Sequence, residues 1–382
     1  RGKKGTKVIV SIARKGAKDL LDYTIIRDKI PTYSVDVSYM IDKETGYIKV
    51  SRFAENTFFE FHDALVALKA KGMKQLIIDL KDNPGGYMDR ATDIADEFLS
   101  EGKLIVYTDG KGTRYDSKIY AETKGDFEKG SVIILINEGS ASASEIVSGA
   151  LQDNDRGLIV GRRSFGKGLV QRPIPLSDQS ELRLTISRYY TPSGRCIQKP
   201  YESDDISSYH SDLINRYKKG EFFCADSVKF ADSLTCKTTK GRTVYGGGGI
   251  MPDVFVPRDT SDYTDYLLAL FNKNLIREYT LDYFTNNKSK LQGMPFEQFK
   301  TSFIVTDAML NELIALGKKS DIKYNDEQFQ KSKTFLKANI KAYIARSLYG
   351  NPGFYPIINE TDEIYMTALK QFSKAKALEK GK

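Results

Sequence analysis

The sequence predicts an α/β protein with a mixed sheet, followed by an all-α C-terminal region. Short apolar runs without polar alternation, such as residues 76–78 and 132–136, alternate with segments of helical period, which is typical of parallel strands buried on both faces. Past residue 257 the segments show helical periods with charged faces. The 382 residues are enough for two or three domains.

The individual elements follow from local patterns. We expect strands at residues 8–12 and 23–27, then a hairpin of residues 35–41 and 47–50 whose loop holds Gly46 at positive φ. The alternating residues 182–190 predict an antiparallel or edge strand. Between them we expect, in chain order, helix 54–70, strand 76–78, helix 87–99, strand 104–107, strand 132–136, helix 144–152 and strand 158–160.

Composition excludes several classes of function. The net charge is +8, but the basic residues are spread along the chain, so no nucleic-acid partner is predicted. No apolar run reaches the ~18 residues of a membrane span. Structural roles are expected for His62 and His210, the two histidines of the chain, which leaves no Ser-His-Asp triad or His-rich metal site. Three cysteines form no CxxC pair, and pairing of Cys224 with Cys236 stays open.

Three short segments carry candidate chemistry, each with a structural alternative. In DNPGG (82–86), paired glycines let backbone N–H groups approach a ligand, although such pairs are common in turns. SASASE (140–145) places hydroxyls at a helix start, where a capping box of Ser142 and Glu145 is the alternative. FGKG (165–168) sets a lysine between glycines, as a tight turn would. The glycine run 246–249 lacks a following GK[ST] and is interpreted as a structural turn.

Together the three segments predict nucleophilic catalysis by a serine. With histidine excluded, the base that takes the hydroxyl proton must be Lys, Asp or Glu. A lysine serves only as the neutral amine, so burial must lower its pKa from ~10.4 toward ~7 to 8. The tetrahedral intermediate needs two N–H donors, which Ala143 together with Gly85 or Gly86 can supply.

The motifs SASASE, GKGLVQ, DNPGG and GGGGIMPD resemble those of the C-terminal processing, or tail-specific, serine peptidases. The resemblance runs from about residue 8 to residue 257 and implies a Ser/Lys peptidase core of the ClpP/crotonase-like type at residues 31–257. It assigns Ser142 as nucleophile and Lys167 as general base, because the family spacing of 25 residues selects Ser142 over Ser140 and Ser144. No metal or cofactor is implied.

The resemblance also assigns supporting residues. Gln171, four positions after the lysine, is expected to orient the amine. Side chains four apart lie ~6 Å apart in a helical turn and ~13 Å apart in a strand, so we expect a turn or short helix at residues 167–171. Asp153 is expected to be a structural support. The implied substrates are proteins or peptides bound by their C-terminal tails, and a catalytically silent peptide-binding scaffold is the alternative function, against which the intact Ser142, Lys167 and Gln171 argue.

The ends of the sequence are interpreted in the same way. Residues 1–30 are expected to be the C-terminal remnant of a PDZ-like domain with linker strands, from a longer precursor whose export signal lies upstream. The resemblance places such enzymes in the periplasm or cell envelope. Residues 258–382 match no motif, and packing against the core or a homo-oligomer contact are the two roles considered.

Overall fold

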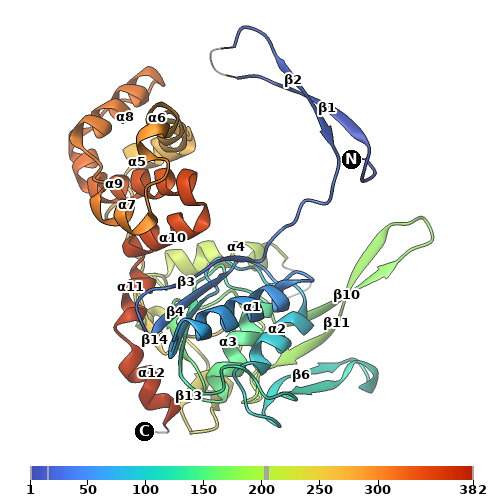
Figure 1. Cartoon of the computed structure of the whole chain (residues 1–382). Helices are drawn as coiled ribbons and strands as arrows, with labels where there is room; N and C mark the ends of the chain where they lie inside the picture. The colour runs from blue at the N-terminus through green and yellow to red at the C-terminus, as the bar shows by residue number, and fades with distance from the viewer. Residues whose placement is uncertain (1, 15–16, 202–205, 381–382) are drawn as a thin grey trace. The chain divides into compact units, whose positions relative to one another are not determined.

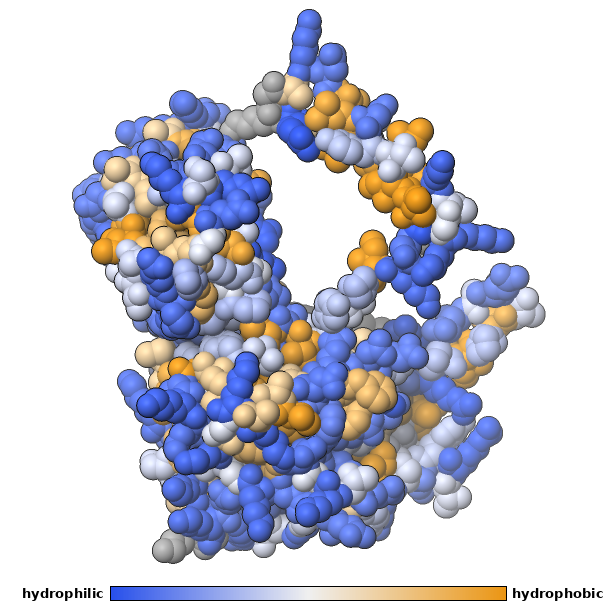
Figure 2. Space-filling view, viewed as in Figure 1, coloured by the Kyte–Doolittle hydropathy of each residue, from blue (hydrophilic) through white to orange (hydrophobic). Residues whose placement is uncertain are grey.

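The computed structural model describes residues 2–14, 17–201 and 206–380, which fall into two compact units, 1–33 and 34–382. The first unit is an antiparallel ribbon of β1 (Lys7–Ile12) and β2 (Leu21–Ile26), as predicted. Apolar side chains are exposed along it (Figure 2), among them Ile9, Leu20 and Ile26 at 67%, 63% and 64%.

The second unit is built on a mixed six-stranded sheet in the order β14-β9-β8-β5-β4-β3. Figure 1 labels its edge strands β14 and β3, with β4 beside β3. β3 (Val35–Met40) pairs antiparallel with β4 (Thr45–Val50). The remaining pairs are parallel and continue from β4 through β5 (Gln75–Asp79), β8 (Ser131–Ile136), β9 (Leu158–Gly161) and β14 (Val254–Phe255). The predicted α/β core with a mixed sheet is confirmed.

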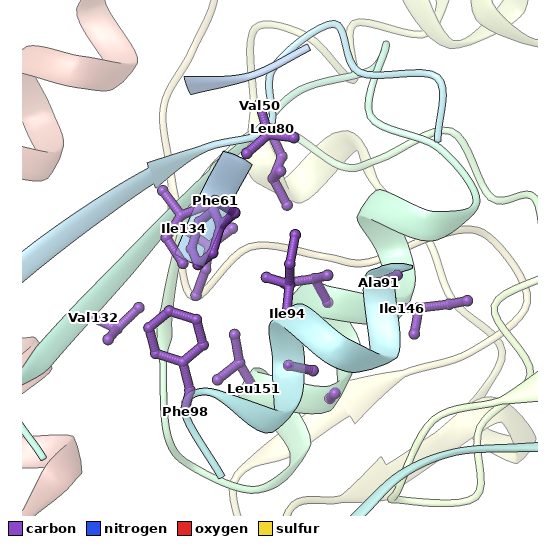
Figure 3. Packing of buried hydrophobic residues seen from close by; sticks show 14 of the residues in the cluster. Val50, Phe61, Leu80, Ala91, Ile94, Phe98, Val132, Ile134, Ile146 and Leu151 are labelled. Atoms are coloured by element: carbon purple, nitrogen blue, oxygen red, sulfur yellow. The ribbon is translucent and has the colours of Figure 1, made fainter. Parts of the chain in front are cut away.

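One face of this sheet is covered by the helices that connect its strands, α1 (Thr57–Ala70), α2 (Met88–Asp96) and α3 (Ala143–Asp153). Every second residue of the central strands, such as Val132 and Ile134, belongs to the cluster that also holds Phe61, Ile94 and Leu151 of these helices (Figure 3). The apolar runs are therefore strands buried on both faces, as the missing polar alternation indicates.

The opposite face is covered by the last two helices, α11 (Glu363–Leu369) and α12 (Phe372–Glu379). Ile133 and Leu135 of β8 pack there with Ile364, Ala368 and Ala375. Since a parallel sheet needs cover on both sides, these two helices complete the α/β core, although they lie beyond residue 257, where the sequence placed its boundary.

In the sequence, six α-helices lie between the last strand of the sheet and α11, and together they bury a separate apolar core. Leu267, Leu310, Leu336 and Ile340 lie at its centre. These helices are α5 (Asp265–Asn272), α6 (Leu275–Leu291), α7 (Phe296–Ser302), α8 (Asp307–Lys319), α9 (Asp326–Tyr349) and α10 (Asn351–Ile358). The predicted all-helical region is confirmed, and no helix within the described residues is long and apolar enough to cross a bilayer.

A second, antiparallel sheet has the order β10-β11-β6-β7. β10 (Leu169–Pro175) and β11 (Glu181–Tyr190) extend beyond this sheet as a two-stranded ribbon (Figure 1), and β11 is the predicted antiparallel strand. The other strands are β6 (Leu104–Gly110) and β7 (Ser117–Tyr120). Between β11 and the glycine run 246–249, the chain forms α4 (Ile206–Lys218) and an antiparallel pair of short strands, β12 (Thr235–Lys237) and β13 (Thr243–Tyr245).

One local prediction is wrong. Gly46 lies within β4 and has no positive φ. A Cβ at this position would overlap Met73 Sδ and lie 3.1 Å from Leu68 Cδ1, so close packing requires the glycine, whereas the turn does not. Cys196, Cys224 and Cys236 are all free thiols.

Candidate active site

The three motif segments follow three neighbouring parallel strands. The glycine loop (residues 81–87) follows β5, the serine loop (137–142) follows β8, and the lysine loop (162–168) follows β9. Because the carboxyl ends of neighbouring parallel strands meet at one edge of a sheet, the loops come together there. They line one cavity of about 560 Å³ to which Gly85, Gly86, Ser142, Lys167 and Gln171 all contribute.

The SASASE motif (140–145) presents one of its three hydroxyls to this cavity. Ser140 and Ser144 are fully buried, and their hydroxyls donate to the carbonyl oxygens of Leu80 at 2.7 Å and Asn83 at 3.0 Å. Ser142 lines the cavity at the start of α3. The structure thus singles out Ser142 by exposure, which agrees with the choice made from spacing.

The backbone of Ser142 is strained. Its φ of 56° and ψ of −114° are sparsely populated by residues with a side chain, at a cost of about 1–3 kcal/mol. Such a conformation persists only where surrounding contacts impose it. Here Ala141 N–H donates to Asn83 O at 3.0 Å and Ser142 N–H to Glu145 Oε2 at 2.8 Å, the carboxylate side of the expected capping box.

The two glycines of the glycine loop have different roles. A Cβ on Gly85, whose φ is +93°, would lie 2.7 Å from Ser142 Cβ, so the glycine permits the loops to touch. The Gly85 N–H donates to Asn83 Oδ1 at 2.9 Å. The N–H groups of Gly86 and Ala143 have no acceptor within the described part of the chain, and these two remain available as oxyanion donors.

Lys167 and Gln171 meet, but not through the predicted turn or helix, which is wrong. Lys167 lies in a loop without regular secondary structure and Gln171 lies within β10, yet Lys167 Nζ donates to Gln171 Oε1 at 3.4 Å. The pairing of β10 with β11 shifts register between Val170 and Gln171. This irregularity breaks the regular extension assumed in the sequence argument, and two long side chains span the remaining gap.

Glu145 connects the serine loop to the lysine loop. This fully buried carboxylate accepts four hydrogen bonds, from Ser142 N at 2.8 Å, Ser164 Oγ at 2.5 Å, Gly166 N at 2.7 Å and Lys167 N at 2.9 Å. Burial raises the pKa of Glu145, and the hydrogen bonds oppose part of that rise. The sequence indicated a capping residue here and missed the link between the two loops.

Tyr189 of β11 provides a second link, which the sequence did not indicate at all. Its hydroxyl lies 2.6 Å from Lys167 O, to which it donates, and 3.1 Å from Ser142 O. The side chain is 1% exposed and lines the cavity. Burial raises the pKa of Tyr189 well above its usual range, so the phenol stays a neutral donor.

The lysine loop is also held from outside the cavity. Arg216 of α4 donates to Arg163 O at 2.7 Å and Ser164 O at 3.0 Å. Ile250, directly after the glycine run, donates its N–H to Ser164 Oγ at 2.6 Å, which agrees with a structural role for that run. Gly168 N–H donates to Gln198 Oε1 at 2.9 Å. The loop therefore reaches the cavity on a backbone fixed on several sides.

Two other candidates lie away from this cavity. Asp153, at the far end of α3, is buried in an ion pair with Arg195 at 2.7 Å and does not line the cavity. His62 Nδ1 lies 2.7 Å from Glu97 Oε1, and with Asp126 these side chains could hold a metal ion. Lys69 Nζ already pairs with Asp126 at 2.5 Å, so the group is satisfied as an ion-pair cluster. The side chain of His210 lies outside the described residues.

Two family models match separate segments of this chain, and curated proteins resemble it over longer stretches. Residues 44–208 match the model of peptidase family S41, and residues 266–350 match a family of unknown function, DUF8443. A carboxy-terminal-processing protease of Bartonella bacilliformis is 38% identical over 270 residues, which cover 69% of this chain and 59% of that protein. Carboxy-terminal processing protease CtpA of Bacillus subtilis is 35% identical over 243 residues, which cover 61% of this chain and 51% of that protein.

Among solved structures, a photosystem II D1 C-terminal processing protease aligns with a TM-score of 0.43 and 23% identity, covering 68% of this chain and 58% of that one. The chain spans between half and three-fifths of the length of the two curated relatives, at 51% and 59%.

Proposed function

Residues 44–208 belong to peptidase family S41, and on this premise we propose that the chain is a serine endopeptidase that cuts proteins near their C-termini. The observation that carries the proposal is the shared cavity of Ser142, Lys167 and Gln171. Phe53, Ile146 and Leu169 also line it, so the cavity suits an apolar side chain beside the cleaved bond.

The nucleophile, the base, its orienting amide and the two N–H donors have separate roles in the proposed reaction. The neutral amine of Lys167 takes the hydroxyl proton of Ser142 as Oγ attacks the carbonyl carbon, and Gln171 Oε1 orients that amine. The N–H groups of Gly86 and Ala143 stabilise the resulting oxyanion. The Lys167 ammonium then protonates the leaving amine, and the recovered neutral amine activates the water that hydrolyses the acyl-enzyme.

We also propose that residues 1–30 belong to a PDZ-like domain that binds substrate tails by strand addition. Support comes from the ribbon of β1 and β2. A two-stranded ribbon alone is marginally stable in water, and its exposed Ile9, Leu20 and Ile26 would be buried against further strands.

The test of the proposed activity is cleavage of an unstructured protein by the wild type and by Ser142→Ala. We expect the wild type to release C-terminal fragments, identified by mass spectrometry, and the variant to release none because the nucleophile is gone. Ser148→Ala is the matched control, since its buried hydroxyl bonds Ser144 O at 2.8 Å within the same helix. A Ser142→Ala variant that cleaves as fast as the wild type would contradict the proposal, and a wild type that binds the protein without cleaving it would favour a silent scaffold.

Gly85→Ala should reduce kcat at least tenfold, because the added Cβ pushes against Ser142 and Ala143 N and displaces nucleophile and oxyanion donor together. Gly102→Ala is the matched control. Gly102 also has positive φ, +81°, but nothing lies within 4 Å of its added Cβ, so it shares only the backbone strain. Equal kcat values for the two variants would show that crowding at Gly85 is unimportant.

A further inference from the structure

Beyond the cavity, each of the three loops carries a charged residue where it leaves the sheet. These residues, here called the loop roots, are Lys81 in the glycine loop, Glu138 in the serine loop and Arg162 in the lysine loop. Lys81 and Arg162 are each 6% exposed, and Arg162 Nε lies 2.9 Å from Glu138 Oε2. Charges this shielded from water need partners, and the search for those partners leads to the C-terminal helices.

The partners are two consecutive residues at the start of α11, here called the acidic pair, Asp362 and Glu363. Asp362 forms an ion pair with Lys81, and Arg162 Nη1 lies 3.1 Å from Glu363 Oε1. Asp362 also caps α11 by accepting Tyr365 N–H at 2.9 Å. One helix start therefore contacts two loop roots directly and reaches the third through Arg162.

Two of the loop roots, Lys81 and Glu138, have pKa values that favour their charged forms. Burial alone would lower the pKa of Lys81, but the carboxylates of Asp79 and Asp362 raise it above its usual range. Burial would likewise raise the pKa of Glu138, yet the Arg162 guanidinium brings it below the ordinary value. Lys81 and Glu138 thus enter their ion pairs in the charged form.

We propose that Asp362 and Glu363 are positioning residues for catalysis, through which the C-terminal helices fix the glycine and lysine loops relative to each other. This inference rests on the proposed peptidase activity. Lys81 precedes Gly85 by four residues and Arg162 precedes Lys167 by five, so a shift of a root moves an oxyanion loop or the base. Misplacement of catalytic groups by about 1 Å costs up to about 100-fold in rate.

Asp362→Asn, Glu363→Gln and the double variant test this proposal without removing the fold. Asn at position 362 can still cap α11. Lys81 keeps Asp79 at 3.5 Å and Arg162 keeps Glu138, so neither cation is left unpaired. We expect kcat to fall about tenfold in each single variant and further in the double variant, with KM within about twofold of the wild type, since substrate contacts are untouched.

Glu360→Gln is the matched control. Its carboxylate lies two residues before the acidic pair but pairs with Lys300 of α7 at 3.1 Å, away from the loop roots. We expect wild-type kcat from this variant. A second measurement, hydrogen–deuterium exchange of peptides covering residues 81–87 and 162–168, needs no activity and should show faster exchange in the Asp362 and Glu363 variants only.

The outcomes separate the two proposals. If the wild type shows hydrolysis that depends on Ser142, and the double variant keeps both kcat and wild-type exchange, the positioning role is overturned. If the wild type shows no hydrolysis, the proposed function fails, and exchange in the two loops alone decides whether the acidic pair holds them. A matching loss of kcat in Glu360→Gln would attribute the effect to general destabilisation and also overturn the positioning role.

Discussion

Lys167→Met removes hydrolysis, with an expected loss in kcat of about 10⁴-fold or more, because methionine fills a similar volume but takes no proton from Ser142. The fold should persist. Within the described residues the amine makes one hydrogen bond, to Gln171 at 3.4 Å, while the backbone of the lysine loop is held by Glu145, Tyr189 and Arg216. Steady-state kinetics and a thermal melt together distinguish the lost base from an unfolded chain.

The pH profile of the wild type identifies the base more directly. While the ammonium form dominates, the share of neutral amine rises about tenfold per pH unit, so kcat/KM should climb with pH and then level off. In Gln171→Glu a carboxylate replaces the amide that meets the amine, favours the ammonium form and should move the profile to higher pH. Gln298→Glu, on the exposed surface of α7, makes the same charge change and should leave the profile in place. A profile independent of pH in the wild type would exclude the neutral amine as base.

Local patterns in the sequence were sufficient to predict the order of the strands and helices in the α/β core and the positions of the three loops. Buried strands such as β8 show as unbroken apolar runs, and the glycine and serine motifs mark the turns that follow them. The same reasoning assumed regular geometry, which is why it predicted a turn or short helix at residues 167–171, where the structure has a loop and a strand whose pairing is irregular. Gly46 was misassigned because a glycine required by a neighbour's side chain looks the same as one required by a turn.

Contacts between distant residues could not be predicted in this way. Tyr189 lies 47 residues from Ser142 in the chain, and nothing in its local pattern distinguishes it from Tyr190 beside it. The sequence also did not indicate that α11 packs on the sheet. The amphipathic period of α11 would fit a separate helical domain equally well. Local patterns show that a group will be buried but do not show which distant residue it contacts, because those contacts depend on the whole fold.

Glu145→Gln should lower the free energy of unfolding by about 2–6 kcal/mol and kcat by about 100-fold or more. Each carboxylate oxygen of Glu145 accepts two hydrogen bonds, Oε1 from Ser164 and Gly166 and Oε2 from Ser142 and Lys167. Glutamine keeps one acceptor oxygen and turns an NH₂ group toward the other two donors. Whichever way the amide faces, two buried donors lose their acceptor, at about 1–3 kcal/mol each.

The effect on rate should exceed what stability alone explains, since the serine and lysine loops lose their shared anchor. Kinetics measured well below the melting temperature, where both proteins are fully folded, isolate this effect. Glu312→Gln is the matched control: its exposed carboxylate accepts a hydrogen bond from Tyr279 at 2.9 Å, which an amide oxygen can also accept, and its stability should change by less than about 0.5 kcal/mol. A Glu145→Gln variant that is destabilised yet retains wild-type kcat would show that Glu145 supports the fold without aligning Ser142 and Lys167.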